Sequence, residues 1–246
     1  INKGSVFGLV GSNGAGKTTL MKLLAGIYRP DKGQVLVNSE RVAENVDIKY
    51  RLVFIPDQLY FFPNYSILDM AEFYKSIYPH WNQERFLKLQ EVFLMDRKRK
   101  IKTLFKGMQR QASFWLALAL MPEILILDEP LDGLDPVMRG KVKNLIIQDV
   151  AEREMTVVIS SHNLRELEDI CDSIAIMHNG SILIQKDLDE LKADIHKIQL
   201  AFTGESPETL ELDEIEIIHQ EKRGSVFLLI VRGNHQEIIS ALRSLK

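Results

Sequence analysis

The sequence predicts an α/β protein with a mainly parallel β-sheet, a helical insert and a small C-terminal α+β extension. Short apolar runs of strand character alternate with helical patterns, which is the order of elements in a parallel sheet. A helical stretch at about residues 64–121 interrupts this alternation, and a separate group of strands and one helix follows residue 196. We therefore expect one domain at 1–196, interrupted by the insert, and a small unit at 197–246.

The composition is that of an ordinary globular chain and excludes several classes of protein. Of 246 residues, 46% are hydrophobic and 26% charged, and the net charge of -3 gives no general attraction to nucleic acid or anionic lipid. The single cysteine, Cys171, excludes an internal disulfide framework and fits a reducing compartment. The longest apolar run, Phe114–Met121, is far shorter than the roughly 18 residues of a membrane span. Another chain would have to supply any span.

The first part of the domain combines strand, helix and turn signals. Val6–Val10 is a short apolar run followed by glycine, as expected of a buried strand, and a helix is expected at about 16–24. Turn residues fill 28–33, and further strands are expected at 34–38 and 52–55.

The insert and the second part of the domain follow. Ser66 and Asn82 are suitable N-caps for helices at 67–77 and 83–95, and a third helix is expected at about 107–120. Later strands are expected at 124–128, 156–160, 173–177 and 181–185, with helices at 137–152 and 164–171. The extension is expected to hold strands at 198–202, 215–219 and 226–231 and a helix at 237–245.

A phosphate-binding loop is predicted directly after the first strand. The residues match G-x-x-x-x-G-K-S/T between a buried strand and a helix, as this motif requires. The glycines allow a ring of backbone N–H groups around a phosphate, and the helix N-terminus adds a favourable dipole. Lys17 would bring its charge to the β- and γ-phosphates, and the Thr18 hydroxyl would ligate Mg²⁺. The predicted nucleotide-binding residues are Gly11, Ser12, Asn13, Gly14, Ala15, Gly16, Lys17, Thr18 and Thr19.

A pair of acids, Asp128 and Glu129, ends the apolar run that starts at Ile124. Two adjacent acids at the end of a buried strand are costly unless a cation compensates their charge, and Mg²⁺ can do so. Asp128 would hold the ion through its water shell, and Glu129 would polarise the attacking water as the general base. Taken alone, an exposed turn ended by Pro130 and Gly133 would explain the pair equally well.

Further motifs occur in an order that resembles the ABC ATPases. Leu131–Asp135 resembles the D-loop of that family, with Asp135 as its last residue, and Ser160–His162 resembles the segment of the switch histidine. The position of the L-S-G-G-Q signature is occupied by Leu104, Phe105, Lys106, Gly107 and Met108. The resemblance covers about residues 1–193.

This resemblance implies a P-loop NTPase core with a helical insert, and a pair of such domains with two ATP molecules sandwiched between them. It implies that His162 contacts the γ-phosphate and helps to hold the water and Glu129, so that the catalytic residues are Glu129, His162 and Lys17. In the family, the first strands and an adenine-stacking aromatic residue precede the phosphate loop, and we expect both upstream of Ile1. Gly107 opens a helix whose N-terminus is a second candidate anion site, which a head-to-tail pair would use, although without the resemblance an ordinary helix start is the preferred interpretation.

Two positions depart from the family pattern. Phe105 stands where the signature has serine and cannot donate a hydrogen bond to a γ-phosphate, although Gly107 still offers its backbone N–H. Asp57 falls at the glutamine position of the Q-loop and Gln58 is next; either could reach Mg²⁺ or the attacking water, and both stay candidates. The aromatic segment 59–65 belongs either to the groove that receives a cytoplasmic helix of the membrane subunit or to packing within the insert.

The leading interpretation is the ATP-hydrolysing motor subunit of an ABC transporter, peripheral at the cytoplasmic face of the cell membrane. Lys106–Met108 favours the bacterial exporter-like group, whose signature is often L-S-K-G-M. The expected partners are a polytopic membrane subunit and a second ATP-binding subunit, identical or different. Nucleic acid is not expected, because a basic run as short as 97–100 is usually a solvated face.

Two alternatives compete with this interpretation. A soluble ABC-type ATPase usually carries two cassettes, long coiled coils or zinc insertions, and the sequence has none of these. A regulatory nucleotide-binding module with little turnover is favoured by Phe105, and the intact Lys17, Asp128 and Glu129 argue against it.

Overall fold

The structure is a computed structural model that describes residues 1–201, 215–233 and 235–243. The chain divides into two compact units, Ile1–Gln185 and Lys186–Lys246. The boundary expected after residue 196 falls inside strand β9 (Ile195–Ala201). Helix α7 (Leu188–Asp194) leads directly into β9 and contacts it, so this helix belongs with the second unit.

The first unit is built on a six-stranded sheet with the order β4-β5-β6-β1-β7-β8. All four pairings from β4 through β7 are parallel, which confirms the predicted α/β class. Strand β8 follows β7 after a turn at Asn179 and Gly180, both with positive φ, as in a two-residue hairpin. The strands are β1 (Val6–Val10), β4 (Leu52–Ile55), β5 (Ile124–Leu127), β6 (Thr156–Ser161), β7 (Ser173–His178) and β8 (Ser181–Asp187).

The central strands are continuous apolar runs because both of their faces are covered. Side chains from the five parallel strands and from α1 (Lys17–Leu24) form one core cluster on the sheet. Its members include Phe7, Leu9, Met21, Ile126, Val158 and Ala175. This core fixes the carboxyl ends of the parallel strands, where the site described below is located.

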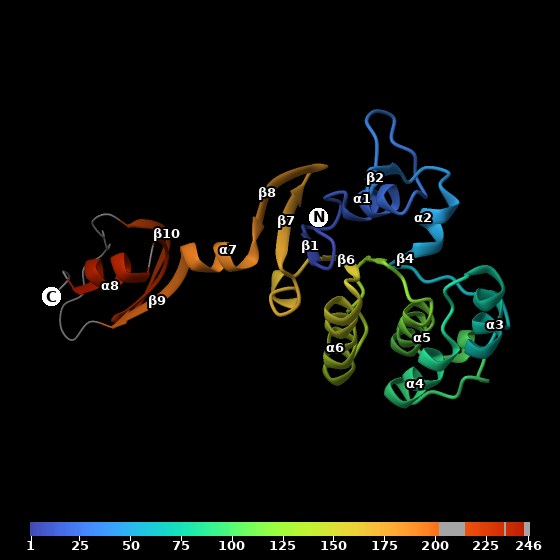
Figure 1. The fold of residues 1–246 in the computed structure, drawn as a ribbon. Coiled ribbons are helices and arrows are strands. Elements are labelled where there is room, and N and C mark those ends of the chain that lie inside the picture. Colours follow the sequence, from blue (N-terminus) through green and yellow to red (C-terminus); the bar gives the residue numbers. More distant parts are fainter. Residues whose placement is uncertain (202–214, 234, 244–246) are drawn as a thin grey trace. The chain divides into compact units, whose positions relative to one another are not determined.

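The predicted insert is present as three α-helices and a short 3₁₀ turn, η1 (Ile101–Thr103), and Figure 1 shows α3 and α4 beside α5. Ser66 begins α3 with a capping box, since its hydroxyl accepts from the Asp69 N–H and the Asp69 carboxylate accepts from the Ser66 N–H. Trp115 is fully buried in α5, and its indole N–H donates to the Phe86 carbonyl at 2.7 Å. The helices are α3 (Ile67–Ile77), α4 (Gln83–Phe93) and α5 (Lys106–Ala119).

A buried ion pair joins the insert to helix α6 (Pro136–Arg153) of the sheet-bearing part. Asp149 of α6 is 1% exposed and accepts from Arg85 of α4 at 2.7 Å and from Arg153 at 3.0 Å. The two guanidinium groups together satisfy a carboxylate that would otherwise be costly to bury.

Several segments differ from the prediction, including helix α7, which was not predicted. The helix expected at 164–171 is only a 3₁₀ turn, η2 (Leu164–Glu166), because the Leu167 and Ile170 N–H groups bond carbonyls three residues back. The strand expected at 34–38 shrinks to β2 (Leu36–Val37), which pairs with β3 (Glu40–Arg41). Helix α2 (Val46–Arg51), capped by Asn45, was not predicted. Helix α4 ends at Phe93, two residues early, because Leu94 adopts a left-handed conformation with φ 52°.

The second unit contains a three-stranded antiparallel sheet with the order β10-β11-β9 and helix α8 (His235–Arg243). Its core joins Phe227, Leu229 and Val231 of β11 to Ile238 of α8. The flanking strand is β10 (Glu216–Arg223), and β11 is Val226–Arg232. The ends of two predicted elements, Phe202 and Leu245, lie outside the described residues. Within the described part of the chain, no helix combines the length and the apolar character needed to cross a membrane.

Candidate active site

The loop between β1 and α1 has the backbone of a phosphate cradle. Gly14 and Gly16 have φ of 82° and 104°, a region that L side chains rarely occupy. At Gly11 the limit is space, because a Cβ added there would lie 2.4 Å from the Met177 carbonyl oxygen. The glycines are therefore required by the path of this loop.

A cavity of 260 Å³ opens on this loop. Its wall consists of residues 12–19 together with Asp57 and Glu129. The structure thus brings Asp57 to the phosphate loop and leaves Gln58 exposed outside the lining of the cavity. Gly11 lies behind the wall, where its carbonyl accepts a hydrogen bond from Lys17.

Lys17 is the buried cation of the cavity. Its side chain is 5% exposed, and its ammonium donates to the Gly11 carbonyl at 2.7 Å and to the Ser12 carbonyl at 3.3 Å. The same ammonium forms an ion pair with Glu129 Oε1 at 3.1 Å. In this arrangement the cation that a phosphate would meet is held by the carboxylate at the end of β5.

Asp128 is fully buried at the end of β5 and has a defined partner for each oxygen. Thr18 Oγ1 donates to Oδ2 at 2.7 Å, and Ser160 Oγ donates to Oδ1 at 2.7 Å. Ser160 Oγ also accepts from the Glu129 N–H at 2.9 Å, so one hydroxyl orients both acids. Ser160 was not among the predicted site residues. The strand order of the sheet, which places β6 beside β5, brings it there.

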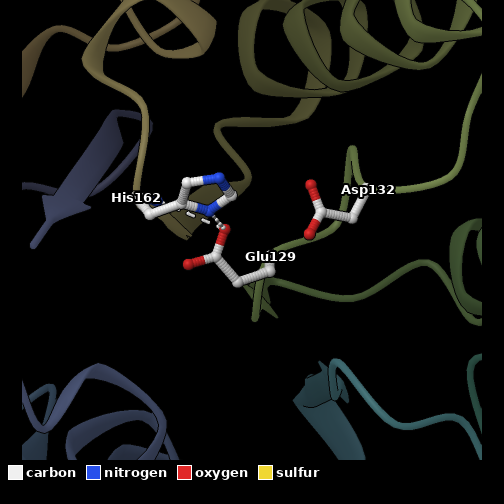
Figure 2. Close-up of side chains that lie close together, drawn as sticks. All are labelled: Glu129, Asp132 and His162. Atoms are coloured by element: carbon white, nitrogen blue, oxygen red, sulfur yellow. Dashed lines mark hydrogen bonds and ion pairs between the residues drawn. The ribbon is translucent and has the colours of Figure 1, made fainter. Parts of the chain in front are cut away.

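Glu129 and His162 lie side by side at the site, Glu129 mostly buried and His162 with a side chain that is 49% exposed (Figure 2). Glu129 Oε2 lies 3.0 Å from His162 Nδ1 and accepts from the His162 backbone N–H at 3.3 Å. The hydrogen bond to Glu129 and the negative charge of that carboxylate raise the pKa of His162, and Asp132 adds a smaller effect in the same direction. One ligand-type atom from each of Glu129, Asp132 and His162 lies within 4.8 Å of the others.

A chain of hydrogen bonds fixes the segment that carries His162. Ser161 Oγ donates to Glu166 at 2.9 Å, and Arg139 of α6 donates to Glu166 at 2.8 Å. Arg139 also donates to the Leu134 carbonyl at 3.0 Å, which ties this network to the 131–135 segment. Sequence reasoning missed both Arg139 and Glu166, whose mutual contact joins residues 27 positions apart in the chain.

The predicted signature lies at the start of α5 and does not line the cavity of its own chain. Leu104 is buried, whereas Phe105 is 80% exposed and its side chain makes no capping bond to the helix. Gly107 packs against the 131–135 segment so closely that a Cβ there would lie 2.4 Å from the Gly133 carbonyl oxygen. Asp135 is the N-cap of α6, and its carboxylate accepts from the Met138 N–H at 2.9 Å.

A glycine-rich loop that opens a helix, together with acids at the end of another parallel strand of the same sheet, defines the protein as a P-loop ATPase. A family model described as "ABC transporter" matches residues 1–132. The chain belongs to the ABC transporter family, and it is an ATP-binding, ATP-hydrolysing subunit.

Relatives with known names support this assignment. The chain is 32% identical over 246 residues to the ABC transporter ATP-binding protein YtrB of Bacillus subtilis, covering 100% of this chain and 84% of that protein. It is 34% identical over 195 residues to the bacitracin transport ATP-binding protein BcrA of Bacillus licheniformis, covering 78% of this chain and 64% of the relative.

Solved structures agree with the fold. A structure described as an ATP-binding subunit of an ABC transporter superposes with a TM-score of 0.71 at 25% identity, covering 78% of this chain and 82% of that one. The dimeric ATP-binding cassette MJ0796 bound to ADP and Pi superposes with a TM-score of 0.69 at 21% identity, covering 76% and 87%, and shows the fold alone.

Proposed function

We propose that this subunit drives transport through a polytopic membrane subunit, as a peripheral protein on the cytoplasmic side of the membrane, and hydrolyses ATP together with Mg²⁺. The observation that carries this proposal is that Lys17 and Glu129 pair in the wall of the phosphate cavity, with Asp128 bonded to Thr18 and His162 bonded to Glu129. A regulatory module without turnover would have no need of a positioned base beside a phosphate cradle.

The chemical step follows from the placement of these groups. Glu129 Oε2 takes a proton from water as the water oxygen attacks the γ-phosphorus, and the bond to the leaving ADP oxygen breaks. His162 orients the Glu129 carboxylate through their 3.0 Å contact. Lys17 leaves its ion pair with Glu129 to meet the β- and γ-phosphates, where charge develops.

The residues present fit a magnesium ion. Mg²⁺ prefers oxygen ligands and keeps several waters, and the Thr18 hydroxyl and the Asp128 carboxylate already lie 2.7 Å apart. Asp57 places a further carboxylate at the same cavity. Thr18 would ligate the ion, Asp128 would hold it through water, and Asp57 would contact the ion or its water shell. The ion would neutralise phosphate charge.

We further propose that the subunit works as one of a pair. The N-terminus of α5 offers backbone donors that its own cavity does not use, so a second subunit's nucleotide is the ligand that fits. A structural neighbour is a dimeric cassette, which agrees with this arrangement. Since Phe105 cannot donate to a phosphate, pairing with a different subunit that carries serine would leave one intact site and one weakened site.

The docking surface proposed for the membrane subunit is the aromatic segment 59–65. Tyr60 is 75% exposed, and Phe62 and Tyr65 are partly exposed. Phe62 also packs edge-on against Phe73 of α3 with ring centroids 4.9 Å apart, so the segment is anchored on the insert while it presents aromatic surface. Aromatic anchors of this kind suit a protein interface. The direction of transport is proposed to be export, on the strength of Lys106–Met108.

Co-purification tests the transporter assignment. The chain, expressed together with candidate polytopic membrane proteins, should be retained by one of them in detergent and should show ATPase activity in that complex. Tyr60→Ala should weaken the retention, whereas Tyr28→Ala, which removes an aromatic side chain that is 47% exposed outside this segment, should not. A chain that hydrolyses ATP and co-sediments with ribosomes, and that no membrane protein retains, would favour the soluble alternative.

A further inference from the structure

Arg110 is a buried cation beside the active site, and the chemical step proposed above gives it no role. It lies in the second turn of α5 and is 2% exposed, which makes it one of the largest fully buried side chains among the described residues. A guanidinium cannot lose its charge in a protein and is costly to bury unless its donors and its charge are matched. Its partners therefore indicate why it is there.

Among the described residues, the hydrogen-bond partners of its guanidinium lie on the loop after β4. Arg110 Nη1 donates to the Pro56 carbonyl at 2.7 Å, and Nη2 donates to the Asp57 carbonyl at 2.7 Å. Nη2 also reaches the Asp57 side chain, with Oδ1 at 3.3 Å. One planar cation thus holds both the backbone and the carboxylate of Asp57.

Asp57 connects this contact to the nucleotide. Its side chain is 47% exposed, forms part of the wall of the phosphate cavity and contacts Arg110. Arg110 also lies in the field of Asp128 and Asp132, and its charge offsets the repulsion among these acids.

Helix α5 is held from a second direction as well. Gly107, one turn before Arg110, lies in tight contact with the Gly133 carbonyl of the 131–135 segment. The first turns of α5 therefore contact both the loop that carries Asp57 and the segment that follows Glu129.

We propose that Arg110 is a positioning residue that holds the Asp57 carboxylate at the phosphate cavity for Mg²⁺–ATP and ties it to the helix that begins with the signature. The proposal rests on the proposed use of this cavity for Mg²⁺ as well as ATP. Arg110 does not touch the nucleotide. Its effect on the nucleotide passes through Asp57.

The test measures nucleotide affinity by calorimetry, using a non-hydrolysable ATP analogue with Mg²⁺ and again with EDTA. Arg110→Lys keeps the charge but cannot bond two carbonyls and a carboxylate from one plane. Arg110→Lys should weaken binding of the analogue with Mg²⁺ about tenfold, which corresponds to about 1.4 kcal/mol of binding free energy. Its effect on binding in EDTA should be much smaller. Asp57→Asn should do the same, and the double variant should bind no more weakly than Asp57→Asn alone.

Arg85→Lys is the matched control, because Arg85 also pairs with a carboxylate, that of Asp149, away from the cavity. It should lower the thermal midpoint and leave both affinities unchanged. If Arg110→Lys behaves like Arg85→Lys, Arg110 is a purely structural residue and the proposal is overturned. Additive effects of Arg110→Lys and Asp57→Asn would overturn the route through Asp57.

Two further outcomes would also be decisive. If Arg110→Lys does not fold, Asp57→Asn decides alone, and an unchanged Mg²⁺ dependence in that variant refutes the proposal. If the unaltered chain binds the analogue equally with Mg²⁺ and with EDTA, the proposed Mg²⁺ site itself is wrong and this inference fails with it. Failure of the Mg²⁺ site would therefore appear in the unaltered chain, whereas the role proposed for Arg110 predicts loss of Mg²⁺ dependence only in the variants.

Discussion

Replacing Glu129 with glutamine separates binding from chemistry. In the structure this carboxylate touches Lys17 through Oε1 and His162 through Oε2. The amide keeps the shape and can still accept a hydrogen bond from the histidine, but it cannot accept the proton of the attacking water. Loss of a general base lowers the rate by about 10²–10⁴, which corresponds to about 2.7–5.4 kcal/mol at the transition state.

Binding should respond in the opposite direction. The ion pair at 3.1 Å competes with phosphate for the Lys17 ammonium, and both partners are largely buried. If the pair is worth about 1 kcal/mol, the upper end for surface pairs, its removal tightens ATP binding about fivefold. ATP that is bound and not hydrolysed should also hold two subunits together.

Single-turnover phosphate release and equilibrium ATP binding measure the two effects separately. Asp132→Asn is the control, because it removes the same charge from the cluster in Figure 2 without removing the base. It should keep most of the activity. Hydrolysis by Glu129→Gln at a rate near that of the unaltered chain would refute the general-base assignment, and equal losses in both variants would show that only the net charge matters.

Three further predictions concern the same site. Lys17→Ala should abolish tight ATP binding, because it removes the cation aimed at the β- and γ-phosphates; unchanged affinity in a titration would contradict this. The NMR titration of His162 should have its midpoint above 6.5 and move back toward that value in Glu129→Gln. Because this pKa is raised by folding, the stabilisation from the pair is present below the unfolded value and is lost as the pH rises through the folded one. Phe105→Ser should raise ATPase activity and ATP-dependent dimerisation if the chain works as a homodimer, since a hydroxyl bonded to a charged phosphate is worth about 1.5–3 kcal/mol. If a different subunit is needed, the unaltered chain alone should be nearly inactive and recover with that subunit, whereas robust activity that Phe105→Ser does not change would refute the asymmetry.

Sequence reasoning succeeded where the signal is local. Helix α3 was predicted at its observed bounds because Ser66 and the apolar spacing lie within one segment. The α-helix predicted at 164–171 was wrong. The composition permits an α-helix there, but the Leu167 and Ile170 N–H groups bond carbonyls three residues back, as in a 3₁₀ turn. The cap at Asp135 was readable in principle, because Asp-Pro before a helix is a start signal.

The residues that the sequence could not reveal act across long separations. Ser160 meets Asp128 because strand order makes β6 the neighbour of β5, and no local pattern encodes that pairing. Arg110 looks like an ordinary polar position of an amphipathic helix until the fold buries it against Asp57. Asp57 and Gln58 likewise could not be distinguished from the sequence, and only the fold shows that Asp57 lines the cavity.

The close approach of Gly107 to Gly133 limits which residues position 107 can accept. Glycine weakens a helix by up to about 1 kcal/mol relative to alanine, so an isolated α5 would gain stability from Gly107→Ala. In the folded chain the added methyl would lie 2.4 Å from a backbone oxygen, which cannot rotate away as a side chain could. Gly107→Ala, which would favour an isolated helix, is therefore disfavoured in the folded chain. Any larger residue at position 107 would require one of the two backbones to move.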